Sequence, residues 1–362
     1  MMTEPQIVSD LAIPPGEYLE EVLEDLELNQ AELARRMGRP SQAINEIMKG
    51  DKAITPETSI QLEKVLGVPA YIWIGLESEY RLIKASQVEA EKAREEETLL
   101  GNFPYSNLAG LGLVEKTKAP LTQVQNLHRF FGVASLSNLV GVKEYSPAFR
   151  QSTKNNINHE ALASWLRAGA VIANEVECRK YCKDTVVSMM PDIRILTLEE
   201  DPNKIFSRLK IILEACGIVL VVIPHFEKTH TTGATFWVKK DKAVIMMSLR
   251  GSWADIFWFS LLHELGHVLL HDRRGTFLEN STSDPAWKKQ EAEADEFAQK
   301  TLISKKEFQK FKQNNDFSSA SIKFFAKSIG IAPGIVTGRL HHEKLLPYTS
   351  NIGRIRYKWN KP

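Results

Sequence analysis

The feature that most constrains the fold of this chain is a pair of histidines, His263 and His267, inside a long apolar segment. The segment from Trp253 to Leu270 contains no proline and a single glycine, which predicts one continuous buried helix. Residues four apart lie on the same face of a helix, so both imidazoles can bind one Zn²⁺ while Glu264 lies beside them. This H-E-x-x-H pattern therefore predicts a zinc site with Glu264 as the general base.

A zinc ion held for catalysis usually has three protein ligands, so a third is expected elsewhere in the chain. The stretch 290–298, QEAEADEFA, predicts a second helix that supplies carboxylates. On this helix Glu291 and Asp295 share a face, and we expect Glu291 to bind zinc and Asp295 to orient a ligand histidine. Glu293 is the rival third ligand, although it faces another side of the helix. His271 lies a turn beyond the motif and is expected to be structural or at the rim.

The two helices resemble those of known peptidases. The E-x-x-x-D arrangement is similar to that of the gluzincins, the thermolysin-like peptidases. Residues 253–304 resemble the ImmA/IrrE-type metallo-endopeptidases, in which an H-E-L-x-H helix is followed by an E-x-E-A-(N/D)-x-F-A helix. The resemblance implies a zincin-like α+β domain and site-specific cleavage of a repressor or antitoxin-like protein, in response to stress or to a mobile element.

The reaction expected of such a site is peptide hydrolysis, in which Glu264 takes a proton from water and delivers it to the leaving amine. The residue that stabilises the oxyanion is left open. Its candidates lie on segments that can fold over the site, and they are His225, His230, His341, His342 and Tyr348.

Three short apolar runs precede the zinc helix and predict a small sheet packed against it. Residues 217–224 read as a buried strand, and residues 234–239 and 243–248 read as a hairpin across Lys240-Asp241. In zincins an extended peptide can add to an edge strand through main-chain hydrogen bonds. We expect such an edge within residues 233–249.

The first eighty residues predict four or five short helices and no strand. Asn29 and Ser41 are expected to cap two of these helices, and Gly38 to end the first of the two. This is the layout of a helix-turn-helix, whose second helix enters the major groove of DNA. The run from Pro15 to Glu77 resembles the XRE-type helix-turn-helix and, within it, the HigA-like antitoxins, through Pro-Gly-Glu, Gln-Ala-Glu-Leu-Ala, Ile-Thr-Pro-Glu and the closing tryptophan.

If this module binds DNA, polar side chains are expected to reach phosphates and base edges while basic ones anchor the backbone. The candidate contact residues are Gln30, Arg35, Arg36, Arg39, Ser41, Gln42, Asn45, Lys49 and Lys52. Residues 1–80 nevertheless hold six Lys or Arg against fifteen Asp or Glu. A role in docking another protein is therefore the alternative to DNA binding. Regulators of this type are commonly dimers, so a homodimer is expected.

The length of 362 residues suggests two or three domains. We expect a multidomain fold with an all-α helix-turn-helix domain, a helical middle region and an α+β zincin-like (gluzincin) domain with a small sheet. The middle region is expected to form helices at 122–131, 158–182 and 202–215. The predicted divisions are 1–80 for the helix-turn-helix domain, 81–100 for a helical connector, 101–215 for the helical region and 216–362 for the peptidase domain.

The net charge of +1 gives no global attraction to nucleic acid or membranes. Three cysteines without a C-x-x-C pair argue against a disulfide framework or a thiolate zinc site, and the N-terminus lacks the pattern of a signal peptide. A cytoplasmic protein without membrane contact is expected. Two functions follow: a zinc endopeptidase that cleaves a regulatory protein and regulates its own operon through DNA, or a HigA-like regulator whose zinc domain only senses or binds.

Overall fold

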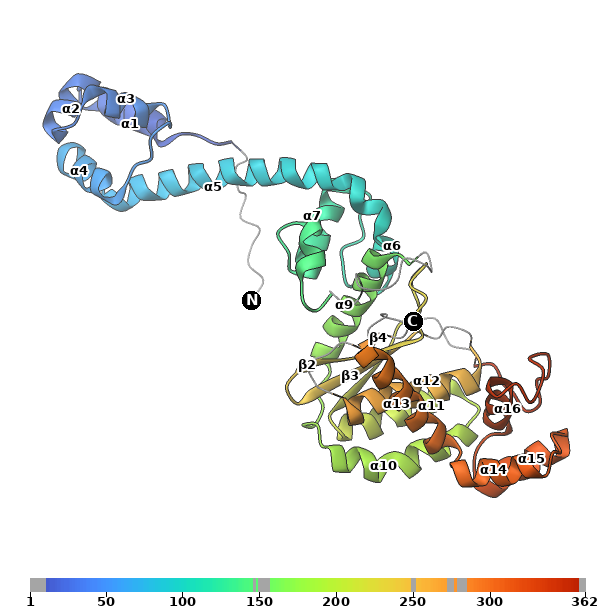
Figure 1. Cartoon of the computed structure of the whole chain (residues 1–362). Coiled ribbons are helices and arrows are strands. Elements are labelled where there is room, and N and C mark those ends of the chain that lie inside the picture. Colours follow the sequence, from blue (N-terminus) through green and yellow to red (C-terminus); the bar gives the residue numbers. More distant parts are fainter. Residues whose placement is uncertain are drawn as a thin grey trace. The chain divides into compact units, whose positions relative to one another are not determined.

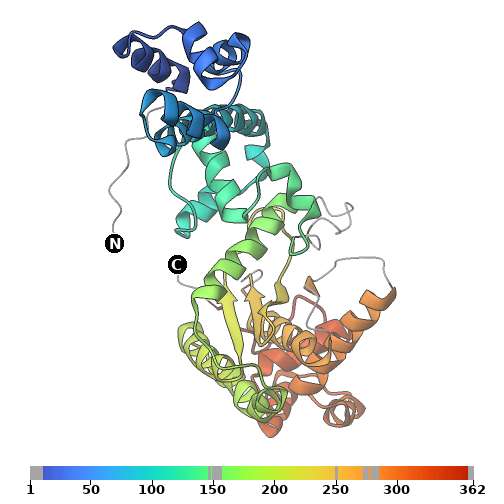
Figure 2. The ribbon, with the colours of Figure 1, turned by 90° about the vertical axis from the view of Figure 1, so that its left-hand side faces the viewer.

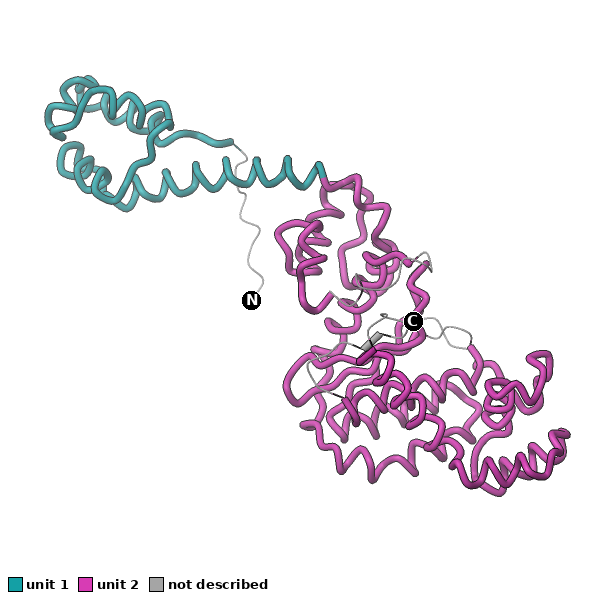
Figure 3. Tube along the Cα trace, viewed as in Figure 1, with its two compact units in different colours: residues 1–95 teal, residues 96–362 magenta. Residues whose placement is uncertain are grey.

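The computed structural model describes residues 11–145, 148, 157–248, 252–271, 277–278 and 285–357. The chain divides into two compact units, residues 1–95 and residues 96–362 (Figure 3). The first ten residues, on which the expectation about secretion rests, and residue 249 of the predicted edge strand lie outside the described residues. Among the described residues, no helix has both the length and the apolar composition needed to cross a bilayer.

Unit 1 is entirely helical in its described part (Figure 1). Its helices are α1 (Pro15–Asp25), α2 (Gln30–Met37), α3 (Ser41–Met48), α4 (Pro56–Leu66) and α5 (Ala70–Glu95). One side chain from each helix meets in a core that is fully or almost fully buried. These side chains are Leu19, Leu33, Ile44, Leu62 and Trp73. The absence of a side chain at Gly16 lets α1 approach α3, because a Cβ there would lie 1.9 Å from the carbonyl oxygen of Met48.

Two of the three predicted boundary residues in unit 1 are confirmed. Asn29 caps α2, since its Oδ1 accepts a hydrogen bond of 2.9 Å from the backbone N–H of Glu32. Gly38 ends α2 in the left-handed region, with φ of 65°. The prediction for Ser41 is wrong, because Pro40 occupies the capping position and Ser41 is already the first residue of α3.

Unit 2 begins with a helical part. Its elements are η1 (Glu96–Asn102), α6 (Tyr105–Gly110), α7 (Pro120–Phe131), η2 (Leu136–Gly141), α9 (His159–Glu175), α10 (Lys183–Ile195), η4 (Leu196–Leu198) and α11 (Pro202–Ala215). The predicted helix 158–182 is wrong at its end, because α9 stops at Glu175. The backbone N–H groups of Tyr181 and Cys182 instead donate to the carbonyls of Asp241 and Cys216, which holds this segment against the sheet.

The sheet has the strand order β1-β3-β2-β4. Its strands are β1 (Ile218–Val222), β2 (Gly233–Lys239), β3 (Lys242–Met247) and β4 (Phe277–Leu278). The predicted hairpin is confirmed as β2 and β3, which pair antiparallel, while β1 runs parallel to β3. The part of the range 233–249 that forms β3 is not an edge strand as predicted, because β3 pairs with β1 on one side and with β2 on the other. On β2, Ala234 and Thr235 already pair with β4.

The two faces of the sheet are covered by different helices (Figure 2). Along β3, Met246 lies against Gly169 of α9, whereas its neighbours Ile245 and Met247 belong to the core around α12 (Ala254–Leu270). Successive residues of a strand point to opposite faces, so α9 and α12 lie on opposite sides of the sheet. The helices that follow α12 are α13 (Pro285–Leu302), α14 (Lys305–Gln313), α15 (Ser319–Ile329) and α16 (Pro333–His342).

Candidate metal centre

The metal centre is built where α12 packs against α13. Helix α12 is apolar on nearly all sides and almost wholly buried, so the few polar groups it carries are held rigidly in the interior. The helices approach closely at Gly266, where a Cβ would lie 3.1 Å from the Cα of Ala294. This contact brings His263 and His267 on α12 opposite Glu291 on α13.

The ligand-type atoms of these three residues form a compact triangle. The two Nε2 atoms of His263 and His267 are 3.0 Å apart, and the Glu291 carboxylate oxygens lie 3.5 Å from the first and 3.4 Å from the second. A tetrahedral zinc site with bonds of about 2.0–2.1 Å separates neighbouring ligand atoms by roughly 3.3 Å. Within the described part of the chain, these residues form the group able to hold a metal ion.

Glu291 supplies a second indication that the triangle fits a cation. Its Oε1 is buried and has no hydrogen-bond partner among the described residues. Although burial alone would raise the pKa of Glu291, its close contacts with His263 and His267 lower that pKa to about 2. A buried carboxylate that stays ionised and has an oxygen without a hydrogen bond suits a metal ion as its partner.

Each histidine of the triangle is oriented through its other ring nitrogen. Nδ1 of His263 lies 2.9 Å from Oδ1 of Asp295, as the sequence predicts. Burial by itself lowers the pKa of His263, but Asp295, Glu291 and the nearby Glu264 together raise that pKa to about 10. The imidazole therefore sits in a strongly negative environment, which favours a positive charge at the centre of the triangle.

His267 is oriented by a chain of two residues that sequence reasoning missed. Its Nδ1 lies 2.9 Å from Nδ1 of His271, and Nε2 of His271 lies 3.2 Å from Oε2 of Glu293. If Nε2 of His267 binds a metal, Nδ1 carries the proton and donates to His271, whose own N–H then donates to Glu293. Glu293, the rival ligand, thus contacts His271, and His271 is buried behind the ligand pair with 3% of its side chain exposed. The sequence signal for this contact was the four-residue spacing between His267 and His271, which places both on one face of a helix.

Glu264 lies on the sheet side of the centre. The side chain is buried, and its Oε2 accepts a hydrogen bond of 2.6 Å from the hydroxyl of Thr235 on β2. Gly233, the first residue of β2, faces the same carboxylate, and a Cβ on Gly233 would lie 2.5 Å from Glu264 Oε1. Strand β2 therefore determines the position of this carboxylate. The hydroxyl of Thr235 binds one oxygen, and the lack of a side chain at Gly233 makes room for the other.

The five candidates for stabilising an oxyanion lie on two segments. His341 lies against Tyr348, with ring centroids 5.2 Å apart, and His342 lines a pocket beside α12. His225 and His230 lie in the loop between β1 and β2. For all five, the oxyanion role stays a prediction.

In unit 1, the exposed face of α3 and the residue that caps its C-terminus supply four of the predicted DNA-contact residues. Its opposite face is buried in the core through Ala43, Ile44 and Ile47. The exposed residues are Ser41, Gln42, Asn45 and Lys49. The amide of Gln42 donates to Glu46 Oε1 at 3.0 Å.

The basic residues of the preceding helix and turn are held by neighbours within the unit. Arg35 and Arg36 both pair with Glu32, at 2.6 and 2.9 Å. Arg39 donates from Nε to Oε1 of Gln61 at 2.6 Å. The remaining two predicted contact residues are exposed, and they are Gln30 and Lys52.

Comparisons with known proteins identify both modules. Residues 214–337 match the model of the IrrE N-terminal-like domain, peptidase family M78, and residues 19–73 match a helix-turn-helix model. The uncharacterized HTH-type transcriptional regulator YddM of Escherichia coli (strain K12) is 30% identical over 73 residues, which cover 20% of this chain and 78% of the relative. Virulence-associated protein I of Dichelobacter nodosus is 35% identical over 77 residues, which cover 21% of this chain and 71% of the relative.

Among solved structures, the Pseudomonas aeruginosa antitoxin HigA with the higBA promoter is 29% identical. The match has a TM-score of 0.23 and covers 24% of this chain and 95% of that chain.

Proposed function

This chain belongs to the proteins that join an XRE-type helix-turn-helix domain to an IrrE N-terminal-like peptidase domain, and we propose that it is a zinc-dependent endopeptidase that cleaves a regulatory protein. The observation that carries the proposal is the triangle of His263, His267 and Glu291 with the buried carboxylate of Glu264 beside it. Two nitrogens and one carboxylate oxygen are the donor set of catalytic zinc sites, which leave a fourth position open.

The residues of the chain take separate roles in the proposed reaction. His263, His267 and Glu291 hold the zinc ion, and Asp295 orients His263 through its Nδ1–H. Zinc bound there supplies Lewis-acid activation of water and of the scissile carbonyl. Glu264 accepts the proton that water loses and delivers it to the leaving amine.

Thr235 acts on Glu264 as a positioning residue. Its hydroxyl donates to Oε2 and so holds the carboxylate in one orientation beside the metal ligands. Glu264 Oε1 lies directly against Gly233, at the place that a Cβ would need. Strand β2 therefore positions both oxygens of the carboxylate, Oε2 through Thr235 and Oε1 through Gly233.

The proposal is tested by adding the purified full-length protein to a lysate of cells that lack it. New protein N-termini, quantified by mass spectrometry, should arise in one or a few regulatory proteins when the protein is loaded with zinc. A sample stripped by a chelator is the control, and zinc added back should restore the same N-termini. A zinc-loaded sample that yields no more new N-termini than the stripped one would overturn the peptidase assignment.

A second activity is supported by unit 1, which we propose binds promoter DNA as a homodimer on two half-sites. Its support is the helix-turn-helix match together with the exposed polar face of α3. Such a role places the protein in the cytoplasm and allows it to regulate its own operon. The alternative remains a regulator whose metal centre senses or binds without cleavage.

Replacing Gln42 and Asn45 together by alanine should remove sequence-specific binding and leave the fold of unit 1 intact, because both side chains are exposed. A well-placed amide contact to a base contributes about 1–3 kcal/mol of discrimination, so the double variant should bind its operator at least tenfold more weakly. The measurement is a titration of a labelled promoter fragment from its own operon at fixed moderate salt. Gln87→Ala on the exposed surface of α5 is the control and should bind like wild type. Equal affinity of the double variant and the control would exclude Gln42 and Asn45 as base contacts, and failure of wild type to bind the fragment would assign unit 1 to protein docking.

A further inference from the structure

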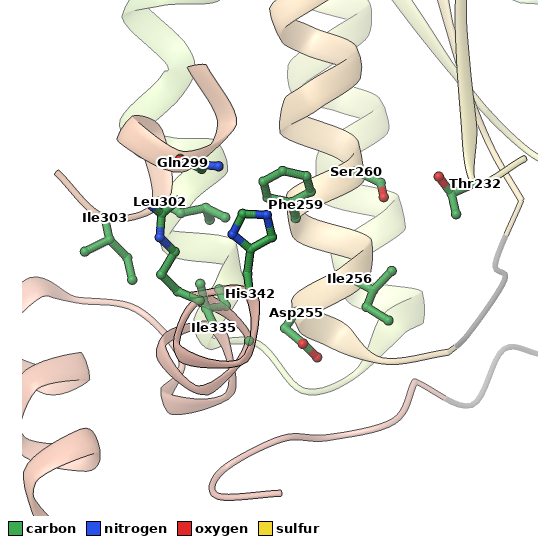
Figure 4. Close-up of a pocket in the computed structure, with 12 residues that line it drawn as sticks. Thr232, Asp255, Ile256, Phe259, Ser260, Gln299, Leu302, Ile303, Ile335 and His342 are labelled. Carbon is green, nitrogen blue, oxygen red and sulfur yellow. The ribbon is translucent and has the colours of Figure 1, made fainter. Parts of the chain in front are cut away.

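A pocket of about 250 Å³ lies between α12, the end of α13 and α16 (Figure 4). We propose that it binds one large apolar side chain of the peptide substrate, next to the bond that is cleaved. This inference rests on the proposed endopeptidase function and names the class of substrate that the site selects. The apolar part of the wall is formed by Ile256, Phe259, Leu302, Ile303 and Ile335.

The pocket adjoins the metal centre on α12 and on α13. Phe259 precedes His263 by one helical turn, and their ring centroids are 6.3 Å apart. Gln299, on the opposite wall, follows Asp295 by one turn of α13. The helices that hold the metal therefore continue directly into the pocket.

The sheet side of the pocket leads to the proposed general base. Thr232, which lines the pocket, comes directly before Gly233, the residue that faces the carboxylate of Glu264. A side chain in the pocket would thus belong to a residue whose backbone lies near Gly233 and the metal centre. This is the path of a substrate whose scissile bond lies beside Glu264.

The size and lining of the pocket select its occupant. Pockets for drug-sized ligands and cofactors measure about 300–1,000 Å³, so this smaller volume suits a single amino-acid side chain. Figure 4 shows the ring of His342 directed toward Phe259 and Leu302, so that it narrows the apolar part of the pocket. A leucine-sized or aromatic side chain fits such a lining better than a polar one.

Arg339 provides an independent indication that a peptide binds here. This pocket residue pairs with Glu343 through Nη2 at 2.8 Å, and its guanidinium lies 5.2 Å from the ring centre of Phe308. Its Nη1 is buried and has no hydrogen-bond partner among the described residues. A buried N–H without an acceptor is costly, and a backbone carbonyl of the bound peptide is the acceptor that a substrate would bring.

The test uses three synthetic peptide hydroxamates that differ only in the side chain next to the metal-binding group, which is methyl, isobutyl or benzyl. Their affinities for the zinc-loaded full-length protein are measured by calorimetry, so the readout does not depend on turnover. The isobutyl compound should bind about tenfold or more tightly than the methyl compound, because it buries three additional carbons. Equal affinities for these two would overturn the pocket proposal and leave the peptidase proposal standing.

Two variants locate the preference in this pocket. Ile256→Trp, at a partly exposed wall position, should reduce the preference for isobutyl over methyl to about twofold or less while methyl affinity stays the same. Ile211→Trp, an exposed position on α11, is the matched control and should behave like wild type. His342→Ala should enlarge the pocket and shift the preference toward benzyl. Unchanged preferences in both pocket variants would overturn the proposal, whereas failure of all three hydroxamates to bind the zinc-loaded protein would overturn the proposed function itself.

Discussion

Glu264→Gln should abolish peptide cleavage while the protein binds zinc as tightly as before. The amide has nearly the same shape as the carboxylate and can still accept the hydrogen bond from the hydroxyl of Thr235, so the surroundings stay in place. It cannot take up a proton at neutral pH, and loss of a positioned general base typically costs about 10²–10⁴-fold in rate. Cleavage is followed on the substrate identified by its new N-terminus, and zinc affinity by competition with a chelator.

Glu296→Gln is the matched control for this variant. Glu296 is a partly exposed carboxylate on α13, where it pairs with Lys300 and Lys305 at the surface. The same chemical change there should leave cleavage and zinc binding at wild-type values. A Glu264→Gln protein that cleaved as fast as this control would exclude Glu264 as the base. Stable capture of a protein by Glu264→Gln, and not by wild type, would in addition identify the substrate.

Glu291→Ala should cause a loss of zinc affinity larger than any change outside the triangle. It removes one of three protein ligands and leaves His263 and His267 facing each other without the carboxylate between them. Zinc at one hundred times its dissociation constant stabilises a folded protein by about 2.7 kcal/mol. The zinc-dependent rise of the thermal midpoint should therefore be present in wild type and absent in the variant at the same zinc concentration.

The zinc affinity of His271→Ala should lie between those of wild type and Glu291→Ala. The variant lacks the residue that orients His267, but it keeps all three ligands. Loss of such an orienting partner typically weakens metal affinity by about 10–100-fold. His271→Asn should recover part of that loss, since its side-chain oxygen can accept the proton from Nδ1 of His267. The control is His128→Ala, which also removes a histidine paired with a carboxylate, that of Glu96 at 2.6 Å. A zinc affinity of His271→Ala equal to that of the control would refute the orienting role.

The local part of the site was predictable from the sequence, because it depends on helical spacing. The four-residue intervals from His263 to His267 and from Glu291 to Asp295 place each pair on one face, and the structure brings the two faces together. Thr235 was not predictable in this way. It meets Glu264 through a contact between residues 29 apart, which no periodicity encodes.

The same distinction explains the successes and errors in the fold. Asn29 and Gly38 act within their own helix ends, and both predictions are confirmed. The edge strand and the end of α9 depend on which segments pair at a distance. Strand β3 lies between β1 and β2, and the segment after Glu175 is drawn into hydrogen bonds with Asp241 and Cys216. Patterns along the chain do not specify such pairings.

The close contact at Gly266 also changes how the H-E-x-x-H motif should be read in this architecture. The pattern treats the position before the second histidine as a wildcard, but here a methyl group would lie 3.1 Å from the backbone of the facing helix. The absence of a side chain at Gly266 lets the two helices approach closely, and this approach determines the distance between the two histidines and Glu291. Because packed interiors yield little, a larger residue at this position would force Ala294 and the helix that carries Glu291 to shift relative to the two histidines.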